Sequence, residues 1–392
     1  MIALDRRGFL KTAGLAGAAV ALGPVAGMIP SCGSGMRLPA MRFSWQRWMT
    51  TRPFAPDADA QGKVWFGSSK FFCYDPAAGS AQMLDNAPMG GKPYSTCLCQ
   101  GEKVYILTQK SPLLYVYHQD RNEYSTLELP DPESNIWFGA RVPGDPRLYL
   151  YVRNRSKLLV WDSEAERGKE IPYPEAMDLW SGFYIEADNA LYSFTLDAKP
   201  CRLIRFDLKK QEFDAVIPGA EPGLEITGVN PVGTRVYCAD RFTGRIFPFD
   251  LERRRWDEPV HVPGHRSVFG FIGLGTSYEG LSLYCLSTYK GTMKWDFNSN
   301  TYLSAGEENI GIDGKPHHFL NKYLVVDPGS GECGFLEAPE SPGKRYPLIC
   351  YSMVVGGRLV ITGYDLGNIT EDSPPMGEKE GELCVYESNS KS

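Results

Sequence analysis

Three of the few histidines in this sequence stand where they could take part in chemistry. The chain of 392 residues contains five histidines; His265, followed by Arg266, precedes one predicted strand, and His317 and His318 precede another. Adjacent residues on a strand point to opposite faces, so at most one of His317 and His318 can face a given site. Imidazoles with a carboxylate could hold a divalent metal ion that polarises a bound carboxylate or water. The spacing matches no metal-binding signature, and surface or capping roles are the alternative.

Arginine and tyrosine side chains form a second candidate set. Removing the proton beside the carbonyl of a uronate- or lactone-type substrate requires a cation or metal to neutralise charge and a His or Tyr base. The same side chains could instead bind a ligand without catalysis, or simply pack between strands, because the chain has 21 tyrosines. The candidates are Arg153, Arg155, Arg241, Arg266, Tyr94, Tyr289 and Tyr364.

Other chemical signatures are missing from the sequence. It contains no serine nucleophile elbow, no phosphate-binding glycine loop, no dinucleotide fingerprint and no Cys-x-x-Cys spacing. Of the ten cysteines, Cys238 and Cys285 follow a tyrosine at a strand position where other copies of the pattern have Ile106 and Leu150. We therefore expect mostly free, buried thiols, with Cys97 and Cys99 on one face of a strand.

The elements that must position these residues are short strands in a repeating unit. A strand such as "KVYIL", "RLYLY" or "RVYCA" returns at intervals of about 44 residues, and a second strand ending in an aromatic residue and Asp follows it. Several units add one strand before this pair and one after it. Four short strands at this period predict an all-β fold, a β-propeller of about eight four-stranded blades over residues 62–392.

Two features of the predicted ring stay open at this stage. Seven blades are the alternative to eight, because only a short stretch separates the units at Asp296 and Asp327. Little chain remains after Glu387, so we expect "MRFSWQRW" in the segment 32–61 to supply the missing outer strand of the last blade.

The aspartates at the ends of the third strands are predicted to cap turns. Asp75 and Asp250 stand where a side-chain oxygen can accept hydrogen bonds from turn N–H groups, and His118 replaces the aspartate in one unit. The run 253–255, three arginines, is then the solvated tip of a turn, with a basic binding patch as the alternative.

The frame "DP..G" after an aromatic strand, with a "KVWF" opener, resembles the exported propellers of the virginiamycin B lyase type. The resemblance covers most of residues 62–388 and implies the fold. Our first functional hypothesis is a propeller that binds a carbohydrate or other small molecule on its loop face, where blades connect. The alternatives are a metal-assisted lyase or hydrolase and an envelope protein-interaction scaffold.

The N-terminal 31 residues predict export. Arg6 and Arg7, followed by "GFLK" and an Ala- and Gly-rich stretch, resemble a twin-arginine signal peptide. Cys32 follows "IPS", which resembles a lipoprotein processing box; cleavage after Gly27 without lipid is the alternative. The expected location is the periplasm or the cell surface, with membrane contact only through a lipid on Cys32. The net charge of −6 argues against a nucleic-acid partner.

Overall fold

The computed structural model describes the chain in segments. These are residues 43–50, 57–67, 71–84, 94–108, 111, 113–131, 136–152, 155–195, 201–222, 224, 226–232, 234–240, 245–261, 267–271, 276–278, 281–289, 292–296, 301–305, 319–326, 333–337, 348–355, 358–365 and 381–388.

Consecutive antiparallel strands form the blades of a ring, numbered here in chain order. Blade 1 contains β2 (Asp57–Ala58), β3 (Val64–Gly67), β4 (Phe71–Asp75) and β5 (Ser80–Leu84). Blade 2 contains β6 (Tyr94–Gln100), β7 (Lys103–Thr108), β8 (Leu113–His118) and β9 (Glu123–Glu128). Blade 3 contains β10 (Ile136–Arg141), β11 (Arg147–Val152), β12 (Lys157–Asp162) and β13 (Arg167–Pro172).

Blades 4 and 5 repeat this plan with small additions. Blade 4 contains β14 (Leu179–Ile185), a 3-10 turn η1 (Glu186–Asp188), β15 (Ala190–Thr195), β16 (Arg202–Asp207) and β17 (Glu212–Pro218). Blade 5 contains β18 (Ile226–Val232), β19 (Arg235–Asp240), β20 (Arg245–Asp250), β21 (Arg255–Trp256) and β22 (Val260–His261).

The last two blades depart from strict chain order. Blade 6 contains β23 (Ser267–Phe271), β24 (Thr276–Tyr278), β25 (Leu281–Tyr289), β28 (Phe319–Val326) and β29 (Cys333–Glu337). A separate two-stranded sheet, β26 (Thr292–Asp296) with β27 (Thr301–Ala305), lies in the connection between β25 and β28. Blade 7 contains β30 (Leu348–Val355), β31 (Arg358–Asp365), β32 (Gly381–Ser388) and β1 (Phe43–Thr50).

The fold is therefore all-β, and the described strands form seven sheets of four or five strands. This number matches the alternative rather than the preferred count of eight. The sequence predicts a separate unit around Asp296. The structure has the β26–β27 hairpin at this place, and strands of blade 6 precede and follow it along the chain. Among the described residues, a strand ending in an aromatic residue and Asp thus occurs there in a sheet of two strands.

The ring is closed by its first and last strands. β1, which contains most of "MRFSWQRW", pairs antiparallel with β32 along its whole length, from Phe43 opposite Ser388 to Thr50 opposite Gly381. Its place is the outer edge of blade 7, because the order of that sheet is β1-β32-β31-β30.

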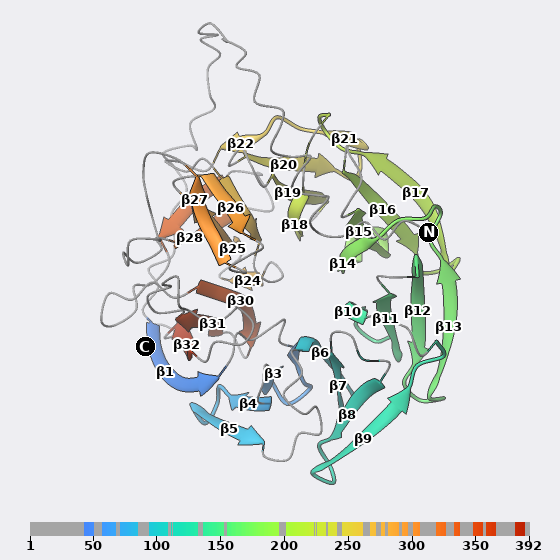
Figure 1. Cartoon of the computed structure of the whole chain (residues 1–392), viewed down its shortest axis with the longest axis vertical. Helices are drawn as coiled ribbons and strands as arrows, with labels where there is room; N and C mark the ends of the chain where they lie inside the picture. The colour runs from blue at the N-terminus through green and yellow to red at the C-terminus, as the bar shows by residue number, and fades with distance from the viewer. Residues whose placement is uncertain are drawn as a thin grey trace, which may run out of the picture.

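Figure 1 shows how the strands are arranged around the centre. The first strands β6, β10 and β14 lie toward the centre, and the fourth strands β9, β13 and β17 lie at the periphery. Since neighbouring strands are antiparallel, the connections from first to second and from third to fourth strand emerge at one end of each sheet, which we call the turn face. The other connections emerge at the opposite end, the loop face.

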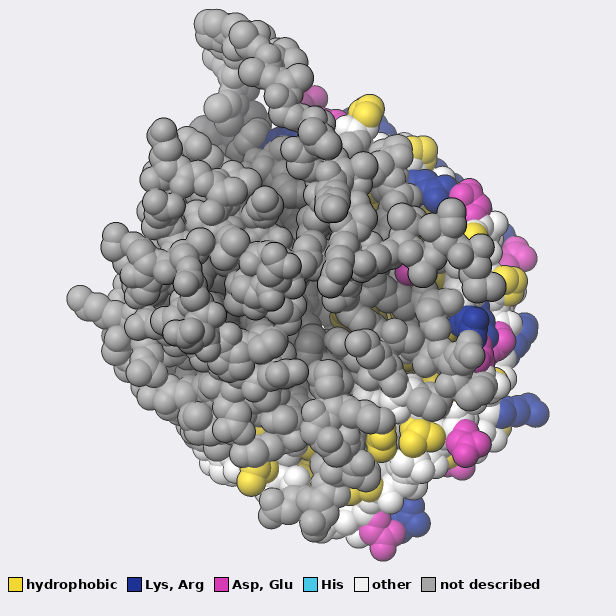
Figure 2. All heavy atoms as spheres, in the orientation of Figure 1, with side chains coloured by type: hydrophobic (Ala, Val, Ile, Leu, Met, Phe, Trp, Pro, Cys, Tyr) yellow, Lys and Arg dark blue, Asp and Glu magenta, His cyan; other side chains and the backbone are white. Residues whose placement is uncertain are grey.

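The burial pattern follows from this stacking of blades. The second and third strands are covered on both faces, so β11 and β15 are runs of buried residues, whereas the outer strand β17 alternates between exposed and half-buried positions. Apolar clusters fill the spaces between neighbouring blades. Charged side chains of both signs are interspersed along the described periphery (Figure 2).

Cysteine contributes to these cores as expected for the part of the chain that is described. Cys73, Cys97, Cys99, Cys201 and Cys238 are free and buried. Cys97 and Cys99 belong to the same cluster between blades 1 and 2, so both thiols lie on one face of β6. Burial raises the pKa of the Cys238 thiol well above its usual value. The thiol therefore stays protonated and unreactive.

Candidate functional site

Most of the residues predicted to do chemistry lie outside the described residues. These are His265, Arg266, His317 and His318, together with Arg153, Arg241 and the lipidation candidate Cys32. For Tyr94, Tyr289 and Tyr364 the backbone is described: they lie in β6, β25 and β31 at the loop-face ends of blades 2, 6 and 7. They therefore belong to three different blades.

Arg155 is described with its side chain, and it takes part in an ion-pair network. Its Nε lies 2.9 Å from Asp131 Oδ2, and Lys157 Nζ lies 3.3 Å from the same oxygen. Lys157 also pairs with Glu170 at 2.7 Å. Asp131 lies in the connection that leads into blade 3, so this network ties that connection to the third strand of its own blade.

An ion pair between the third strand and the connection before the blade recurs on the loop face of the next two blades. Arg202, the first residue of β16, pairs with Glu175 at 3.0 Å, and Arg245, the first residue of β20, pairs with Glu221 at 2.9 Å. Sequence reasoning missed these pairs. Their signal was a basic residue opening the third strand and a carboxylate in the connection before the blade.

The turn face confirms the structural role of the recurring aspartates. Asp75 Oδ1 accepts hydrogen bonds from the N–H groups of Ala77 and Ala78, at 2.9 and 3.0 Å. Asp162, Asp207 and Asp250 cap their own turns in the same way. The side chains of Arg253 and Arg255 are 61% and 62% exposed, so this run is the solvated tip of a turn.

His118 replaces the capping aspartate in blade 2 and makes a different contact. Its Nε2 lies 2.8 Å from Ser125 Oγ on the neighbouring strand β9. Burial and the nearby Arg121 and Lys103 lower the pKa of His118, because each disfavours the charged imidazolium.

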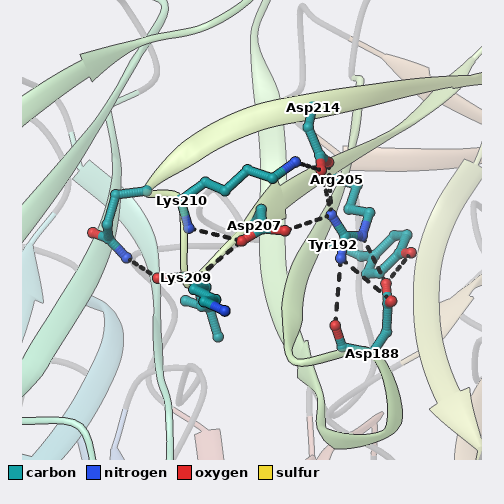
Figure 3. Close-up of polar contacts among 9 residues, drawn as sticks. Asp188, Tyr192, Arg205, Asp207, Lys209, Lys210 and Asp214 are labelled. Atoms are coloured by element: carbon teal, nitrogen blue, oxygen red, sulfur yellow. Dashed lines mark hydrogen bonds and ion pairs between the residues drawn. The ribbon is translucent and has the colours of Figure 1, made fainter.

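A charged cluster joins η1, β15, β16 and β17 of blade 4 at the turn face (Figure 3). Arg205 Nε donates to Asp188 Oδ2 at 2.7 Å and Nη1 donates to Asp214 at 2.6 Å, while Tyr192 Oη donates to Asp188 at 2.6 Å. Burial opposes ionisation of Asp188, but the hydrogen bonds from Arg205 and Tyr192 outweigh it and lower the pKa of Asp188. The hydrogen bond to Asp188 raises the pKa of Arg205 despite burial.

Tyr149 makes the corresponding contact between blades 3 and 4. Its Oη donates a hydrogen bond to Asp145 at 2.9 Å, and Arg147 donates two hydrogen bonds of 2.7 Å to the same carboxylate. Gln211, from the turn of blade 4, donates to Tyr149 Oη at 3.4 Å. Burial raises the pKa of Tyr149 to about 12.

Between blades 1 and 2 the corresponding region holds a cavity of about 360 Å³. Its rim is polar and its floor is aromatic. It is lined by Gln61, Lys63, Trp65, Cys73, Gln82, Leu84, Glu102, Tyr117, Gln119 and Asn122.

The strand register explains how blade 1 supplies one wall of this cavity. Trp65 pairs with Cys73, which pairs with Gln82, so these three side chains form one row across the sheet. Trp65 is fixed by a 2.7 Å hydrogen bond from its Nε1 to Asp59. Trp65 and Tyr117 contact each other with ring centroids 5.3 Å apart, and both are at most 5% exposed, so they close the inner end.

The groups that line this cavity are suited to hydrogen bonding. Burial raises the pKa of Cys73 to about 12, so its thiol stays protonated at neutral pH and is a poor nucleophile. Burial also raises the pKa of Tyr117. Amide groups of three glutamines and Asn122 offer both donors and acceptors.

A second polar centre joins three blades near the centre of the ring. Arg141 of β10 donates to both oxygens of Asp57 on β2, at 2.6 and 3.0 Å, and Cys99 N–H of β6 donates to Asp57 at 2.9 Å. Burial is the largest influence on Asp57 and raises its pKa, although Arg141 opposes this.

Within the described segments no group of three or more His, Cys, Asp and Glu residues could hold a metal ion. No helix in these same segments is long and apolar enough to cross a membrane.

A ring of antiparallel four- and five-stranded sheets, packed face to face, defines the protein as a β-propeller. No protein-family model matches the chain, and no curated protein matches it. Among solved structures it is similar to a streptogramin B lyase, with a TM-score of 0.59 and 10% sequence identity, over 88% of this chain and 98% of that one. The likeness confirms the resemblance to lyase-type propellers at the level of fold alone.

Proposed function

We propose that this β-propeller binds a carbohydrate or another small molecule, and that the cavity between blades 1 and 2 is a binding site. The observation that carries the proposal is the cavity itself. Its volume of about 360 Å³ suits a small ligand, and convergent amide, ammonium and carboxylate groups surround an aromatic floor. It opens on the turn face, because Gln61, Glu102 and Gln119 come from turns at that end.

The cavity differs from the loop-face site proposed from the sequence. On the loop face, Arg155 is held by Asp131, which favours a role in fixing a connection over ligand binding. Binding by Arg153, Arg155, Arg241, Tyr289 and Tyr364 stays a prediction, as do catalysis by His265, Arg266, His317 and His318 with a divalent metal, and the envelope scaffold.

The experiment is a thermal-shift panel on the mature chain with neutral and acidic saccharides. A ligand that binds only the folded state raises the melting temperature as its concentration rises. Gln82→Trp should abolish the shift, because a Trp side chain in the row of Trp65 and Cys73 fills the cavity. Lys169→Trp is the matched control, since Lys169 holds the corresponding register position opposite Val160 in blade 3.

Two results would contradict the proposal. A panel without any shift would remove the binding function, and an undiminished shift in Gln82→Trp would place the ligand elsewhere on the molecule. A reduced shift in Lys169→Trp as well would show a general effect of the new side chain.

We also propose that the chain is exported by the twin-arginine route and is periplasmic or displayed at the cell surface, with a lipid on Cys32 as one form. The paired arginines Arg6 and Arg7 support this. Replacing both by Lys should leave the precursor in the cytoplasm on cell fractionation, and export of that double variant would overturn the assignment.

A further inference from the structure

In blades 1, 2, 3 and 5 a basic residue stands beside the aromatic anchor of the second strand, whereas blade 4 has Ala190 there. Lys63, Lys103, Arg147 and Arg235 each stand two residues before that anchor. Lys103 lies 2.8 Å from Glu166, Arg147 lies 2.7 Å from Asp145, and Arg235 lies 3.4 Å from Asp257. Lys63, which lines the cavity, has no ion pair with any described residue.

The contrast between Lys63 and Lys103 lies in one residue of the facing turn, whereas Arg147 and Arg235 pair with carboxylates of their own blades. Lys103 of blade 2 reaches Glu166 in the turn of blade 3. Asn122 holds the corresponding place in the turn of blade 2, four residues after His118, as Glu166 follows Asp162 by four. Both residues have left-handed backbones, with φ of 53° and 49°, so the two turns match in shape. A neutral amide thus faces the cavity where the next interface has a carboxylate.

Asn122 has a partner of its own within the protein. Its Oδ1 accepts a 2.7 Å hydrogen bond from Tyr117 Oη. This bond orients the amide of Asn122. The Lys63 ammonium can then bind a ligand that enters the cavity.

A second donor in the cavity lacks an acceptor. Gln119 lines the cavity, and its Nε2 is closed off from water without a hydrogen-bond partner among the described residues. A buried donor left unpaired is unfavourable, so a turn of the Gln119 side chain toward an acceptor on a ligand in the cavity is favoured. Glu102 and the amides of Gln61 and Gln82 complete the rim with groups that can bond to hydroxyls.

We propose that the cavity between blades 1 and 2 recognises a small sugar that carries an anionic group, a carboxylate or a phosphate. The anionic group pairs with Lys63 and accepts a hydrogen bond from Gln119, and the sugar hydroxyls bond to Glu102 and the rim amides. This inference rests on the proposed function, because it names the ligand class of the same cavity.

The test is isothermal titration calorimetry of the full mature chain with glucuronate, glucose 6-phosphate and glucose. We expect at least one of the two anions to bind at least tenfold more tightly than glucose. Lys63→Met should weaken that anion's binding by about tenfold, which corresponds to loss of one charge-assisted hydrogen bond. Asn122→Glu should weaken it similarly, because the new carboxylate can pair with Lys63 as Glu166 pairs with Lys103. Lys103→Met, at the next interface, should leave binding unchanged.

The outcomes separate this inference from the proposed function. Equal binding of glucose and both anions, or full anion binding by Lys63→Met, overturns the anion assignment and leaves small-molecule binding in place. If none of the three sugars binds, the anion assignment is wrong, and the saccharide panel alone then decides the proposed function. Melting curves of each variant show that the fold is intact, and Asn122→Glu keeps the test decisive if Lys63→Met does not fold.

Discussion

Arg141 and Asp57 form a two-bonded ion pair, in which the Asp57 side chain is 17% exposed and the Arg141 side chain 36% exposed. Removing Arg141 leaves a mostly buried carboxylate without its counter-ion, which costs more than an exposed pair contributes. Arg141→Met should therefore lower the free energy of unfolding by about 2 kcal/mol at pH 7, measured by urea denaturation. Arg121→Met, whose pair with Asp120 is 54% exposed on both sides, should cost less than about 0.5 kcal/mol.

The pH dependence of this variant has a definite sign. Burial raises the pKa of Asp57, so the folded state binds the Asp57 proton more tightly than the unfolded state. Protonation of Asp57 then favours folding. The loss of unfolding free energy caused by Arg141→Met should therefore become smaller between pH 7 and pH 5. If the loss of unfolding free energy in Arg141→Met became larger on acidification, titration of Asp57 would not be its cause.

Replacing Arg205 should change the free energy of unfolding over a different range of pH. The pKa of Asp188 is lowered, so its contribution to stability is present above its unfolded pKa of about 4 and is lost as pH falls through the folded value. Arg205→Met should cost about 2 kcal/mol at both pH 7 and pH 5, with recovery only at lower pH. Urea titrations across this range test it, with Lys210→Met as the exposed control; recovery already at pH 5 would contradict it.

At the scale of residues, the sequence predicted local contacts and missed distant ones. An aspartate that caps a turn bonds to N–H groups two or three residues away, so its role is visible in a short frame. Asp57 and Arg141 are 84 residues apart, and only the ring brings them together. Nothing in the sequence singles out Lys63, because its lack of an ion pair among the described residues depends on Asn122 in another blade.

The turn between the third and fourth strands is the most regular element of the ring. Its residue before the fourth strand adopts a positive φ in each of blades 1 to 5, as Gly79, Asn122, Glu166, Gln211 and Arg254. The left-handed conformation strains residues with a Cβ, most of all β-branched ones, whereas Asn tolerates it.

Gly79 tests this conformational requirement without steric interference. A Cβ there would meet nothing within 4 Å, so the cost of substitution is backbone strain. Gly79→Val should lower stability by about 2 kcal/mol and Gly79→Asn by less than about 0.5 kcal/mol, measured by thermal denaturation. Equal losses in the two variants would show that side-chain contacts, not backbone conformation, decide the position.

The sequence predicted the strands themselves because their burial leaves a clear pattern. Second and third strands read as short apolar runs bounded by turns, and fourth strands alternate. The β26–β27 hairpin carries the same local signals as a blade, since "KWD" is followed by a turn. Local signals cannot tell whether a hairpin has two further strands beside it, so the repeat predicts eight units where the described strands form seven sheets of four or five strands.

For the whole molecule, the pairing of β1 with β32 offers a covalent test. Arg47 lies opposite Cys384 in the register, within the range of separations that a disulfide can bridge. Arg47→Cys should form a disulfide with Cys384 on mild oxidation, detected by peptide mapping, and should raise the melting temperature. Trp48→Cys, which faces Leu383 instead, should form it far less readily. Failure of Arg47→Cys to cross-link would contradict the register.

The closure of the ring also sets an order of events during synthesis. Blades 1 to 5 form from strands that follow one another along the chain, so each can assemble soon after it leaves the ribosome. β1 precedes the other described strands along the chain, but its partner β32 follows all of them. Until β32 has been synthesised, β1 cannot take its place in blade 7, so this pairing closes the ring only after blades 1 to 5 have left the ribosome.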